Sequence, residues 1–411
     1  MYHGSMQSGG QGVYLANVTR ELARLGHDVH AISGPPYPVL DASVTHHRID
    51  TRSFQRMMLD RRAFFHEIAP VSHFAPLNFY EFASTRFTLT SVMATFTLRA
   101  FARLAQIEAQ SGPFDVIHDN QSLGYGLLLM RGLLGRRVVA NVHHPLDVDM
   151  RTGVAHVASL REKVKRLAWY PWHMQRIVAR RLDALISGSN ASSALIEELW
   201  SLGHGSITTI YDGVDVERFT PGQPEDVRPG ALLFVGNAED YNKGIVYLLR
   251  ALAMLPEGTG AHLYIVGGPA SGQRVAPAEI ARLGLAGRVT IVGRVSDAEL
   301  ADWYRRAAVL VSPSLYEGFG LPAAEAMACG TPVIASEAGA LPEVVAHLDT
   351  GVIVPAGNAR ALAGAIASLL ADPARRRRMG EAGRERVLQR FTWQQHARGV
   401  DALYRRVAGA S

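Results

Sequence analysis

The sequence predicts an α/β protein with two domains, each built on a parallel sheet. Short apolar runs, which suit strands buried on both faces, alternate with helical stretches along most of the chain. Thirty-nine glycines provide the tight turns that this alternation requires. A length of 411 residues exceeds what one hydrophobic core usually supports, so we expect two domains.

The first half of the chain is expected to form a helix and then a series of strands. The helix covers residues 13–25 and ends at Gly26. The expected strands are residues 29–33, 44–49, 115–118, 138–142 and, as the last of this half, 184–187. Glycine and proline interrupt regular structure between residues 206 and 230, which predicts the domain junction there.

The second half repeats the alternation of strands and helices. The expected strands are residues 231–235, 263–266, 289–292, 308–312 and 331–335. Ser296 and Glu299 form a capping box that opens the helix before the fourth of these strands. Three long helices are expected at the end of the chain, over residues 360–370, 373–389 and 392–407.

The most informative segment is residues 314–336, SLYEGFGLPAAEAMACGTPVIAS. It follows a buried strand with a turn in which Gly318 and Gly320 let backbone N–H groups approach a ligand closely. A helix then starts near Pro322, and its free N–H groups and dipole favour a phosphate. In an open α/β sheet, such a junction lies at the carboxyl edge, where ligands bind.

Two carboxylates flank this turn and are expected to have different partners. Glu317 precedes the turn, whereas Glu325 lies about one helical turn beyond it. Because a carboxylate repels a diphosphate, Glu325 is better suited to accept hydrogen bonds from vicinal ribose hydroxyls. The segment therefore predicts a cradle for a nucleotide sugar.

Four segments resemble the signature of retaining GT-B glycosyltransferases, specifically of glycosyltransferase family 4. They are Glu317-x7-Glu325, Tyr211-Asp-Gly-Val-Asp215, Val235 to Gly244 and Gly339 to Val345. The resemblance implies two Rossmann-like domains facing across a cleft, with residues 1–206 on the acceptor side and residues 207–390 binding the donor. It also implies that a helix in residues 391–411 crosses back to the first domain.

The same resemblance implies a reaction and assigns roles to residues. A hexose would move from a UDP-, GDP- or ADP-sugar to an acceptor hydroxyl with its anomeric configuration kept, in a front-face mechanism without a protein base. Glu317 would hold the transferred sugar, His143 would bond a sugar hydroxyl, and Lys243 would act as a point charge on the diphosphate. The other expected substrate contacts are Gly9, Gly10, Asn237, Arg294, Gly318, Phe319, Gly320, Leu321 and Glu325.

Two features depart from the family pattern. Asn237 stands where the family has an arginine. Stabilisation of the leaving diphosphate is therefore either weaker or supplied by another cation, such as Arg294. Alternatively, Arg294 only lines the pocket of the nucleotide base. Only residues 1–8 precede the glycine-rich segment 9–12, where an apolar strand is normal. We therefore expect either a shortened or misassigned start or an irregular strand at residues 1–3. Segment 9–12 is expected either to approach a phosphate or the acceptor, since glycine lets the backbone come close, or to form a plain turn.

No metal is expected in the reaction, because the resembled family uses helix N-termini, amides and basic side chains instead. Asp147 and Asp149 have the D-x-D spacing that chelates a cation in the other large glycosyltransferase fold, but a solvated loop or an acceptor contact explains them better. The single cysteine, Cys329, excludes an internal disulfide framework and suggests a reducing compartment. Its apolar helix marks it as a core residue.

The composition favours a cytoplasmic protein with anionic ligands. No apolar run reaches the ~20 residues that span a bilayer, and residues 1–30 lack the features of a secretory signal. A net charge of +5 suits nucleotide diphosphates or an anionic membrane surface, and no nucleic-acid-binding module is recognised. Two segments leave alternatives open: residues 54–101 are rich in aromatic side chains, and residues 161–181 mix basic with aromatic ones. They form either core-facing helices or an acceptor surface at the inner face of the membrane. The acceptor is accordingly a saccharide, a small molecule or a lipid-linked molecule.

Two other functions stay open at the level of the sequence. Asn237 and the missing first strand suit a non-catalytic partner protein that binds nucleotide sugars. The same two-domain architecture also serves epimerases and phosphorylases. A dinucleotide-dependent dehydrogenase is disfavoured, because no G-x-G-x-x-G follows a first strand with an acidic residue about 20 positions later.

Overall fold

The chain forms two compact units. The computed structural model describes residues 1–409 except for residues 3–9, 36, 50–75, 78, 81–89, 144, 149, 151–158, 162, 165–171 and 269–273. The first unit consists of Met1–Gly188, Ser193–Ile210 and Ala397–Ser411, and the second of Ser189–Ser192 and Tyr211–His396. The main boundary between the two units falls after Ile210.

The second unit is built on a six-stranded parallel sheet with the order β12-β11-β10-β7-β8-β9. The strands are β7 (Ala231–Val235), β8 (His262–Val266), β9 (Val289–Gly293), β10 (Val309–Ser312), β11 (Val333–Ser336) and β12 (Gly351–Val354). The five strands expected here are confirmed to within one or two residues. β12 was not expected from the sequence; it is a four-residue, half-buried strand at the edge of the sheet.

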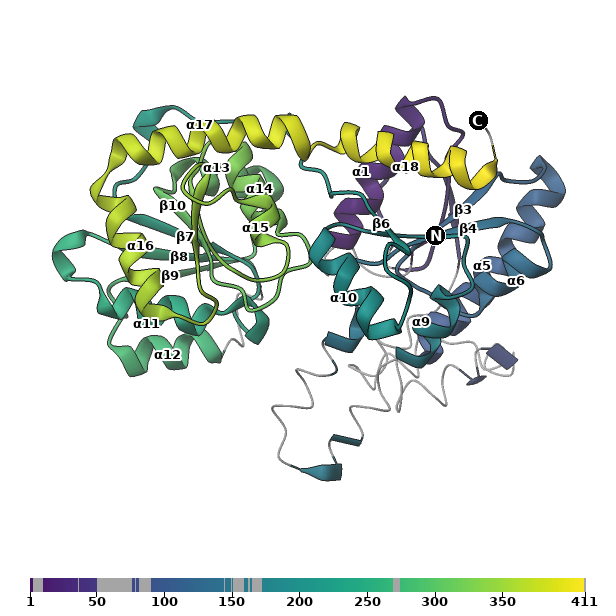
Figure 1. Ribbon diagram of the computed structural model, residues 1–411, viewed down its shortest axis with the longest axis horizontal. Coiled ribbons are helices and arrows are strands. Elements are labelled where there is room, and N and C mark those ends of the chain that lie inside the picture. Colours follow the sequence, from purple (N-terminus) through teal and green to yellow (C-terminus); the bar gives the residue numbers. More distant parts are fainter. Residues whose placement is uncertain are drawn as a thin grey trace, which may run out of the picture. The chain divides into compact units, whose positions relative to one another are not determined.

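Helices cover both faces of this sheet (Figure 1). One face carries α11 (Ile245–Met254), α12 (Val275–Leu283) and α16 (Ala359–Ala371), and the other carries α13 (Asp297–Arg306), α14 (Leu321–Ala328), α15 (Leu341–Val344) and α17 (Pro373–Arg390). Within β7, Leu232 and Phe234 pack into the first layer, whereas Leu233 packs into the second. Successive side chains of a strand point to opposite faces, so a strand covered on both sides has to be apolar throughout.

The first unit contains two small parallel sheets. The two-stranded sheet pairs β1 (His30–Ser33) with β2 (Thr45–Arg48), and the other has the order β3 (Val116–Asn120), β4 (Arg137–Asn141), β5 (Ala184–Ser187) and β6 (Ile207–Thr209). The expectation that residues 184–187 form the last strand was wrong, because β6 follows it. β6 has only three residues, Ile-Thr-Thr, which is too short for a recognisable pattern.

Met1 and Tyr2 lie between these two sheets. The N–H of Tyr2 donates to the carbonyl of Ile32 in β1 at 3.0 Å. On the other side, the Met1 ammonium donates to the carbonyl of His118 in β3 at 2.6 Å, and Asn120 N–H donates to the Met1 carbonyl at 2.9 Å. These two residues therefore join β1 to β3 as a very short parallel strand.

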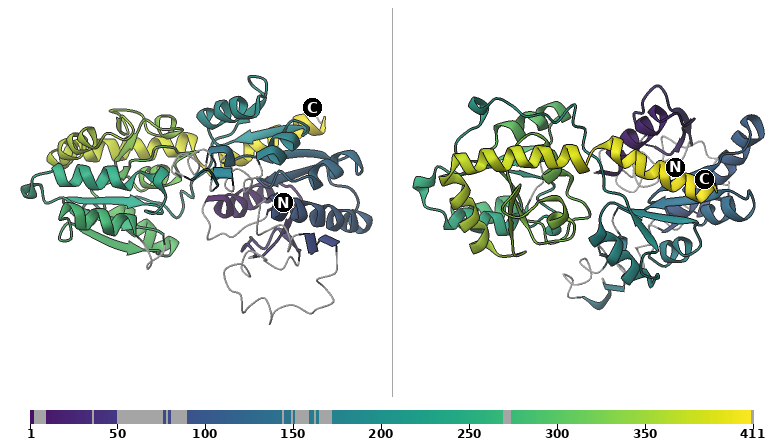
Figure 2. Two further views of the ribbon diagram at one scale, coloured as in Figure 1. Left: turned by 90° about the horizontal axis from the view of Figure 1, so that it is seen from below. Right: turned by 45° about the horizontal axis from the view of Figure 1, so that its top comes forward.

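The main helices among the described residues of the first unit surround its strands. They are α1 (Gly10–Arg24), α5 (Thr90–Ser111), α6 (Gly126–Gly132), α9 (Trp172–Ala179), α10 (Asn190–Trp200) and α18 (Trp393–Ala408). The chain's first and last helices lie together (Figures 1 and 2), where His27 Nε2 contacts Asp401 of α18 at 2.9 Å. Tyr404 of α18 also contacts His118 of β3, with 2.6 Å between Oη and Nδ1. Residues 397–411 thus belong to the first unit although they end the chain.

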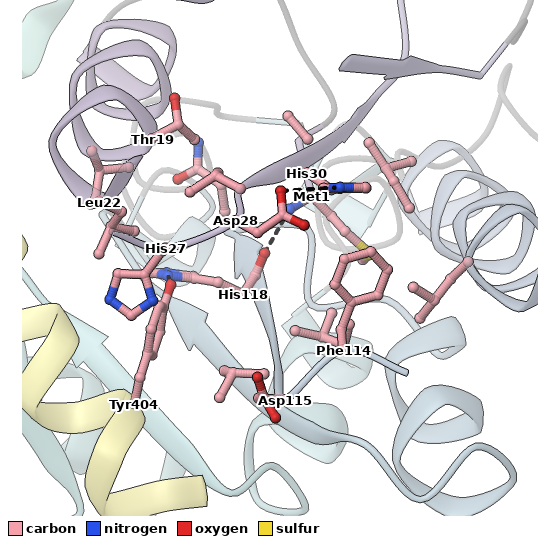
Figure 3. Close-up of a pocket in the computed structure, with 18 of the residues that line it drawn as sticks. Met1, Thr19, Leu22, His27, Asp28, His30, Phe114, Asp115, His118 and Tyr404 are labelled. Carbon is pink, nitrogen blue, oxygen red and sulfur yellow. Dashed lines mark hydrogen bonds and ion pairs between the residues drawn. The ribbon is translucent and has the colours of Figure 1, made fainter. Parts of the chain in front are cut away.

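A cavity of about 630 Å³ lies between β1 and β3 (Figure 3). It borders Met1 and is lined at the amino ends of these strands by His30 and Asp115, and by His27 and Tyr404 from the surrounding segments. Parallel strands bring their ligand-binding loops to their carboxyl ends. The lining also includes Tyr14 and Asn120, so the cavity extends from the amino ends of the strands to the carboxyl end of β3.

Candidate functional site

The candidate site of the second unit lies where the strand order of its sheet reverses. The chain runs from β7 to β9 on one side and then returns to β10 beside β7, so the loops after β7 and β10 diverge from each other. Such a switch point leaves a crevice at the carboxyl ends of parallel strands, which is where open α/β sheets bind ligands. The loops in question are residues 236–244 and 313–320.

Lys243 and Glu317 meet at this point. Lys243 ends the short helix η4 (Tyr241–Lys243) in the loop after β7, and its Nζ donates to both carboxylate oxygens of Glu317 at 3.1 and 3.0 Å. Ser314 Oγ donates to the same carboxylate at 3.1 Å. Burial opposes the ammonium charge, but the carboxylates of Glu317 and Asp240 together outweigh that effect and raise the pKa of Lys243. Two residues predicted separately thus form one ion pair.

Two glycines hold the loops of this ion pair in place. Gly244 has φ +68°, and a Cβ there would lie 2.1 Å from the carbonyl oxygen of Pro313. Gly339, which follows β11, has φ +52°, and a Cβ there would lie 2.1 Å from the carbonyl oxygen of Glu317. That carbonyl instead accepts a hydrogen bond from Ala340 N–H at 3.0 Å. Only glycine fits these close backbone approaches.

The expected glycine-rich turn is held from one side by two serines. Ser189 and Ser192, which belong to the second unit, donate through Oγ to the carbonyl of Gly318 at 2.7 and 2.9 Å. The side chain of Phe319 is buried and packs against the rings of Tyr211 and Phe391. This side chain is therefore part of the core of the second unit, and a substrate contact by the Phe319 backbone stays a prediction.

The rest of the turn leads directly into α14. Gly320 has φ +98° and precedes the helix, and Leu321 is its first residue. Pro322 stands in the first turn, as predicted, where its missing N–H costs no hydrogen bond. The N–H groups of Ala323 and Ala324 donate to the Gly320 carbonyl at 2.9 and 3.1 Å, so the backbone donor left in this first turn for a phosphate is Leu321 N–H.

Glu325 lies in α14 and is bonded to a buried tyrosine. Tyr304 of α13 donates through its hydroxyl to Glu325 Oε2 at 2.7 Å. Burial raises the pKa of Glu325 to about 7, although the hydrogen bond from Tyr304 lowers it in part. The carboxyl group thus changes charge near neutral pH, a property that the sequence did not predict.

Asn237 and Arg294 lie at the carboxyl ends of β7 and β9. Asn237 Oδ1 accepts a hydrogen bond from Glu239 N–H at 3.1 Å, so this side chain stabilises its own turn. Arg294 is exposed directly after β9. The loops after β7 and β10 meet at Lys243, which supplies a cationic side chain there.

The candidate residues of the first unit gather around His143, at the carboxyl ends of β3 and β4. His143 Nε2 lies 2.6 Å from Asn120 Oδ1 and 3.3 Å from Asn141 Nδ2, and its backbone N–H donates to Gln121 Oε1 at 2.8 Å. The ring of Tyr14 contacts the imidazole edge to face at 4.6 Å. His143 was expected from its motif but these partners were not, because the strand that leads to Asn120 and Gln121 was expected to end at residue 118.

The glycine-rich segment near the start is helical from Gly10 onward, which corrects the expectation of a loop at residues 9–12. Gly9 lies outside the described residues, as do most of residues 54–101 and, within 161–181, residues 162 and 165–171. The carbonyl of Gln11 in the first turn of α1 accepts a hydrogen bond from Asn120 Nδ2 at 3.1 Å. The segment therefore contacts the His143 cluster through its backbone.

The remaining chemical candidates are structural in the described part of the chain. Asp147 is buried and accepts a hydrogen bond from Trp200 Nε1 at 2.9 Å, while the side chain of Asp149 is outside the described residues. Burial raises the pKa of Cys329 to about 12, as suits a core residue. Within the described residues, no group of His, Cys, Asp or Glu is arranged to hold a metal. Nor is any described helix long and apolar enough to cross a membrane.

Solved structures define the class of protein. Sucrose-phosphate synthase from Thermosynechococcus elongatus matches with a TM-score of 0.73 at 27% identity, covering 100% of this chain and 96% of that one. An Anabaena protein solved with UDP-glucose matches with a TM-score of 0.65 at 19% identity, covering 98% of each chain, which shows a common fold. With parallel sheets in both units and a switch-point site, the chain is a GT-B glycosyltransferase.

Sequence relatives specify the family. Residues 8–218 match Glycosyltransferase Family 4 and residues 215–386 match Glycosyl transferases group 1. MMP alpha-(1->4)-mannosyltransferase from Mycolicibacterium hassiacum is 36% identical over 408 residues, 98% of this chain and 96% of that protein. D-inositol 3-phosphate glycosyltransferase from Xylanimonas cellulosilytica is 30% identical over 98% of this chain and 92% of that protein. The chain belongs to glycosyltransferase family 4.

The family confirms the function expected from the sequence. The protein is a retaining hexosyltransferase that takes a sugar from a nucleoside diphosphate sugar. The two rival functions, a non-catalytic binding partner and an epimerase or phosphorylase, receive no support from these relatives.

Proposed function

We propose that the enzyme transfers an α-linked hexose to a hydroxyl of a saccharide acceptor without a metal, and that mannose is the first sugar to test. The relative that is 36% identical over nearly the whole chain is an α-(1→4)-mannosyltransferase, which supports mannose and a saccharide acceptor. The observation that carries the chemistry is the Lys243–Glu317 ion pair at the switch point. It supplies one positive charge for a diphosphate and one carboxylate for sugar hydroxyls.

In the proposed reaction, the acceptor oxygen forms a bond to C1 of the sugar as the bond from C1 to the diphosphate breaks. The proton of the acceptor hydroxyl passes to the leaving diphosphate, so both charges and atoms balance. Lys243 stabilises the negative charge on that diphosphate, and Glu317 holds hydroxyls of the sugar. Glu325 accepts hydrogen bonds from the ribose, and His143 bonds a sugar hydroxyl.

The absence of a metal is supported by what Lys243 offers. A divalent cation in such enzymes neutralises the diphosphate, and here the half-buried ammonium of Lys243 and the N–H of Leu321 at the start of α14 suit the same task. Transfer should therefore continue in EDTA. Loss of activity in EDTA that added Mg²⁺ or Mn²⁺ restores would contradict this part of the proposal.

The test measures release of nucleoside diphosphate from GDP-mannose, UDP-glucose and ADP-glucose, with and without a mannose oligosaccharide. We expect one donor to be consumed in an acceptor-dependent manner, with the product retaining the α configuration by NMR. Lys243→Met and Glu317→Gln should each lower kcat by about 100-fold or more. Glu279→Gln is the matched control, since Glu279 also pairs with basic side chains, Arg250 and Arg282, but on α12.

Two outcomes would reject the proposal in different ways. Isomerisation of the donor without an acceptor, or turnover only with orthophosphate, would indicate an epimerase or a phosphorylase. Donor binding without turnover in the wild-type protein would indicate a non-catalytic partner.

We also propose a peripheral contact with the inner face of the membrane, as a cytoplasmic enzyme with an amphipathic or lipid-linked acceptor would make. Phe79, Tyr80, Leu160 and Val164 are exposed apolar side chains within or beside the aromatic and basic segments. Exposed aromatic and apolar side chains beside basic ones suit an anionic lipid surface. Flotation with anionic and with neutral vesicles tests this, and absence of binding to anionic vesicles rejects it.

A further inference from the structure

The orientation of the Asn120 side chain is determined by a backbone group. Asn120 Nδ2 lies 3.1 Å from the carbonyl oxygen of Gln11, in the first turn of α1. A carbonyl oxygen only accepts hydrogen bonds, so the amide nitrogen has to face it. The opposite orientation would place two oxygens in contact. Asn120 Oδ1 therefore points the other way, toward His143.

The orientation of Asn120 decides which nitrogen of His143 carries the proton. Asn120 Oδ1 lies 2.6 Å from His143 Nε2, and an amide oxygen accepts but does not donate. Nε2 has to donate, so the neutral ring exists as the Nε2–H tautomer with its lone pair on Nδ1. The Asn141 amide nitrogen is farther from Nε2, at 3.3 Å, and does not compete with this short contact.

Other contacts fix the place of the imidazole ring. The Gln121 side-chain oxygen accepts a hydrogen bond from the backbone N–H of His143 at 2.8 Å, and the rings of Tyr14 and His143 make a T-shaped contact. Gln121 itself has φ +63°, a left-handed conformation that is uncommon for a residue with a side chain. Such strain persists where the surrounding structure requires it, and it occurs often at functional sites. The amides that end β3 thus hold both the backbone and the ring of His143.

We propose that Asn120 is a positioning residue, which holds His143 in the Nε2–H tautomer and in its orientation for glycosyl transfer. This inference rests on the proposed role of His143 at the sugar. The chain of contacts runs from the backbone of α1 through Asn120 to the imidazole. A sugar hydroxyl that bonds Nδ1 then has to donate its proton to the ring, which sets the direction of that hydrogen bond.

The experiment reads the tautomer directly by ¹⁵N NMR of the full chain labelled in histidine. The His143 resonances are assigned by their loss in His143→Gln. At pH 8 the wild type should show a protonated Nε2 and an unprotonated Nδ1. In Asn120→Leu we expect a mixture of tautomers, kcat lower by about tenfold and KM for the donor changed less than twofold.

Asn17→Leu is the matched control. Asn17 is also buried in the first unit and donates to a backbone carbonyl, that of Val13, at 2.8 Å. It should leave the His143 tautomer unchanged. It should also lower kcat less than Asn120→Leu does, even if it lowers the melting temperature by as much. An Nδ1–H tautomer in the wild type, or an unchanged tautomer in Asn120→Leu, would overturn the inference. If the wild type shows no glycosyl transfer, the proposed function is rejected. The NMR measurement still shows whether Asn120 holds His143 in the Nε2–H tautomer.

Discussion

At the scale of single residues, the ion pair of Lys243 and Glu317 lets the second unit keep two charged side chains mostly buried. Each is mostly buried, with 27% and 13% of the side chain exposed, and each neutralises the other. Breaking such a pair by removing one partner is costly, because it leaves an uncompensated buried charge. A donor would offer both partners at once, a diphosphate for the ammonium and sugar hydroxyls for the carboxylate.

The raised pKa of Glu325 predicts that KM for the donor depends on pH. Its pKa is raised to about 7, so the carboxylate that would accept ribose hydroxyls forms only as pH rises through neutrality. KM for the donor should fall between pH 6 and pH 8. Tyr304→Phe removes the hydrogen bond that lowers this pKa, so the midpoint of the change should move to higher pH. Initial rates over a pH series for both proteins measure the shift.

The control for this substitution is Tyr247→Phe. Tyr247 lies on α11, and its hydroxyl contacts that of Tyr241 at 3.5 Å, away from Glu325. It should leave the midpoint unchanged. A KM that does not vary between pH 6 and pH 8 in the wild type would show that Glu325 does not bind the ribose as a carboxylate.

At the same scale, residue types could be predicted but contacts could not. Glu317 and Lys243 were both expected from their motifs, yet nothing in the sequence indicates that they bond each other. Asn237 stands at the position of a family arginine and turns out to stabilise its own loop. Asn120 and Gln121 carry no motif, and their importance appears only from their contacts with His143.

At the scale of elements, the loop after β11 supports the Glu317 turn through close backbone packing. Gly339→Ala should lower the free energy of unfolding by about 2 kcal/mol, because it combines a positive φ with a Cβ that collides with the Glu317 carbonyl. The same displacement should lower kcat by more than tenfold, since it moves the loop of a site residue. Urea unfolding and initial rates measure the two effects.

Gly364→Ala provides the opposite case. Gly364 is exposed within α16, and no atom lies within 4 Å of the Cβ that alanine would add. This change should stabilise the protein by about 0.5–1 kcal/mol and leave kcat unchanged. Equal effects of the two substitutions would mean that the packing at Gly339 is not important.

The elements themselves were largely predictable, because each depends on local pattern. Buried parallel strands read as apolar runs, and the capping box at Ser296 and Glu299 forms as expected at the start of α13. The errors fall on short edge elements, β6 and β12, where three or four residues carry too little pattern. The start of α1 was also placed too late, since glycine hides a helical first turn.

At the scale of the whole molecule, a buried acid couples folding to pH. Asp212 is 7% exposed, and its Oδ1 has no hydrogen-bond partner in the described part of the chain. Burial raises its pKa from 3.8 to about 7. The folded state therefore binds this proton more tightly than the unfolded state does, and the resulting stabilisation is lost as pH rises from about 4 to about 7.

Asp212→Asn should therefore stabilise the protein more at alkaline pH than at acid pH. We expect the gain in the free energy of unfolding to be about 2 kcal/mol larger at pH 8 than at pH 5. Asp215→Asn in the same turn is the control, because the Asp215 carboxylate already accepts hydrogen bonds from Glu217 and Arg218 N–H groups. A gain for Asp212→Asn that is the same at both pH values would contradict the prediction.

The sequence by itself determined the alternation of strands and helices, the order of the four family segments and therefore the class of reaction. These properties depend on local periodicity and on residues close together in the chain. The tertiary structure alone decided which groups meet. Lys243 and Glu317 are 74 positions apart, and Asn120 bonds both Gln11 and His143, 109 and 23 positions away. Such contacts depend on the order of strands in the sheet, and local pattern contains no record of that order.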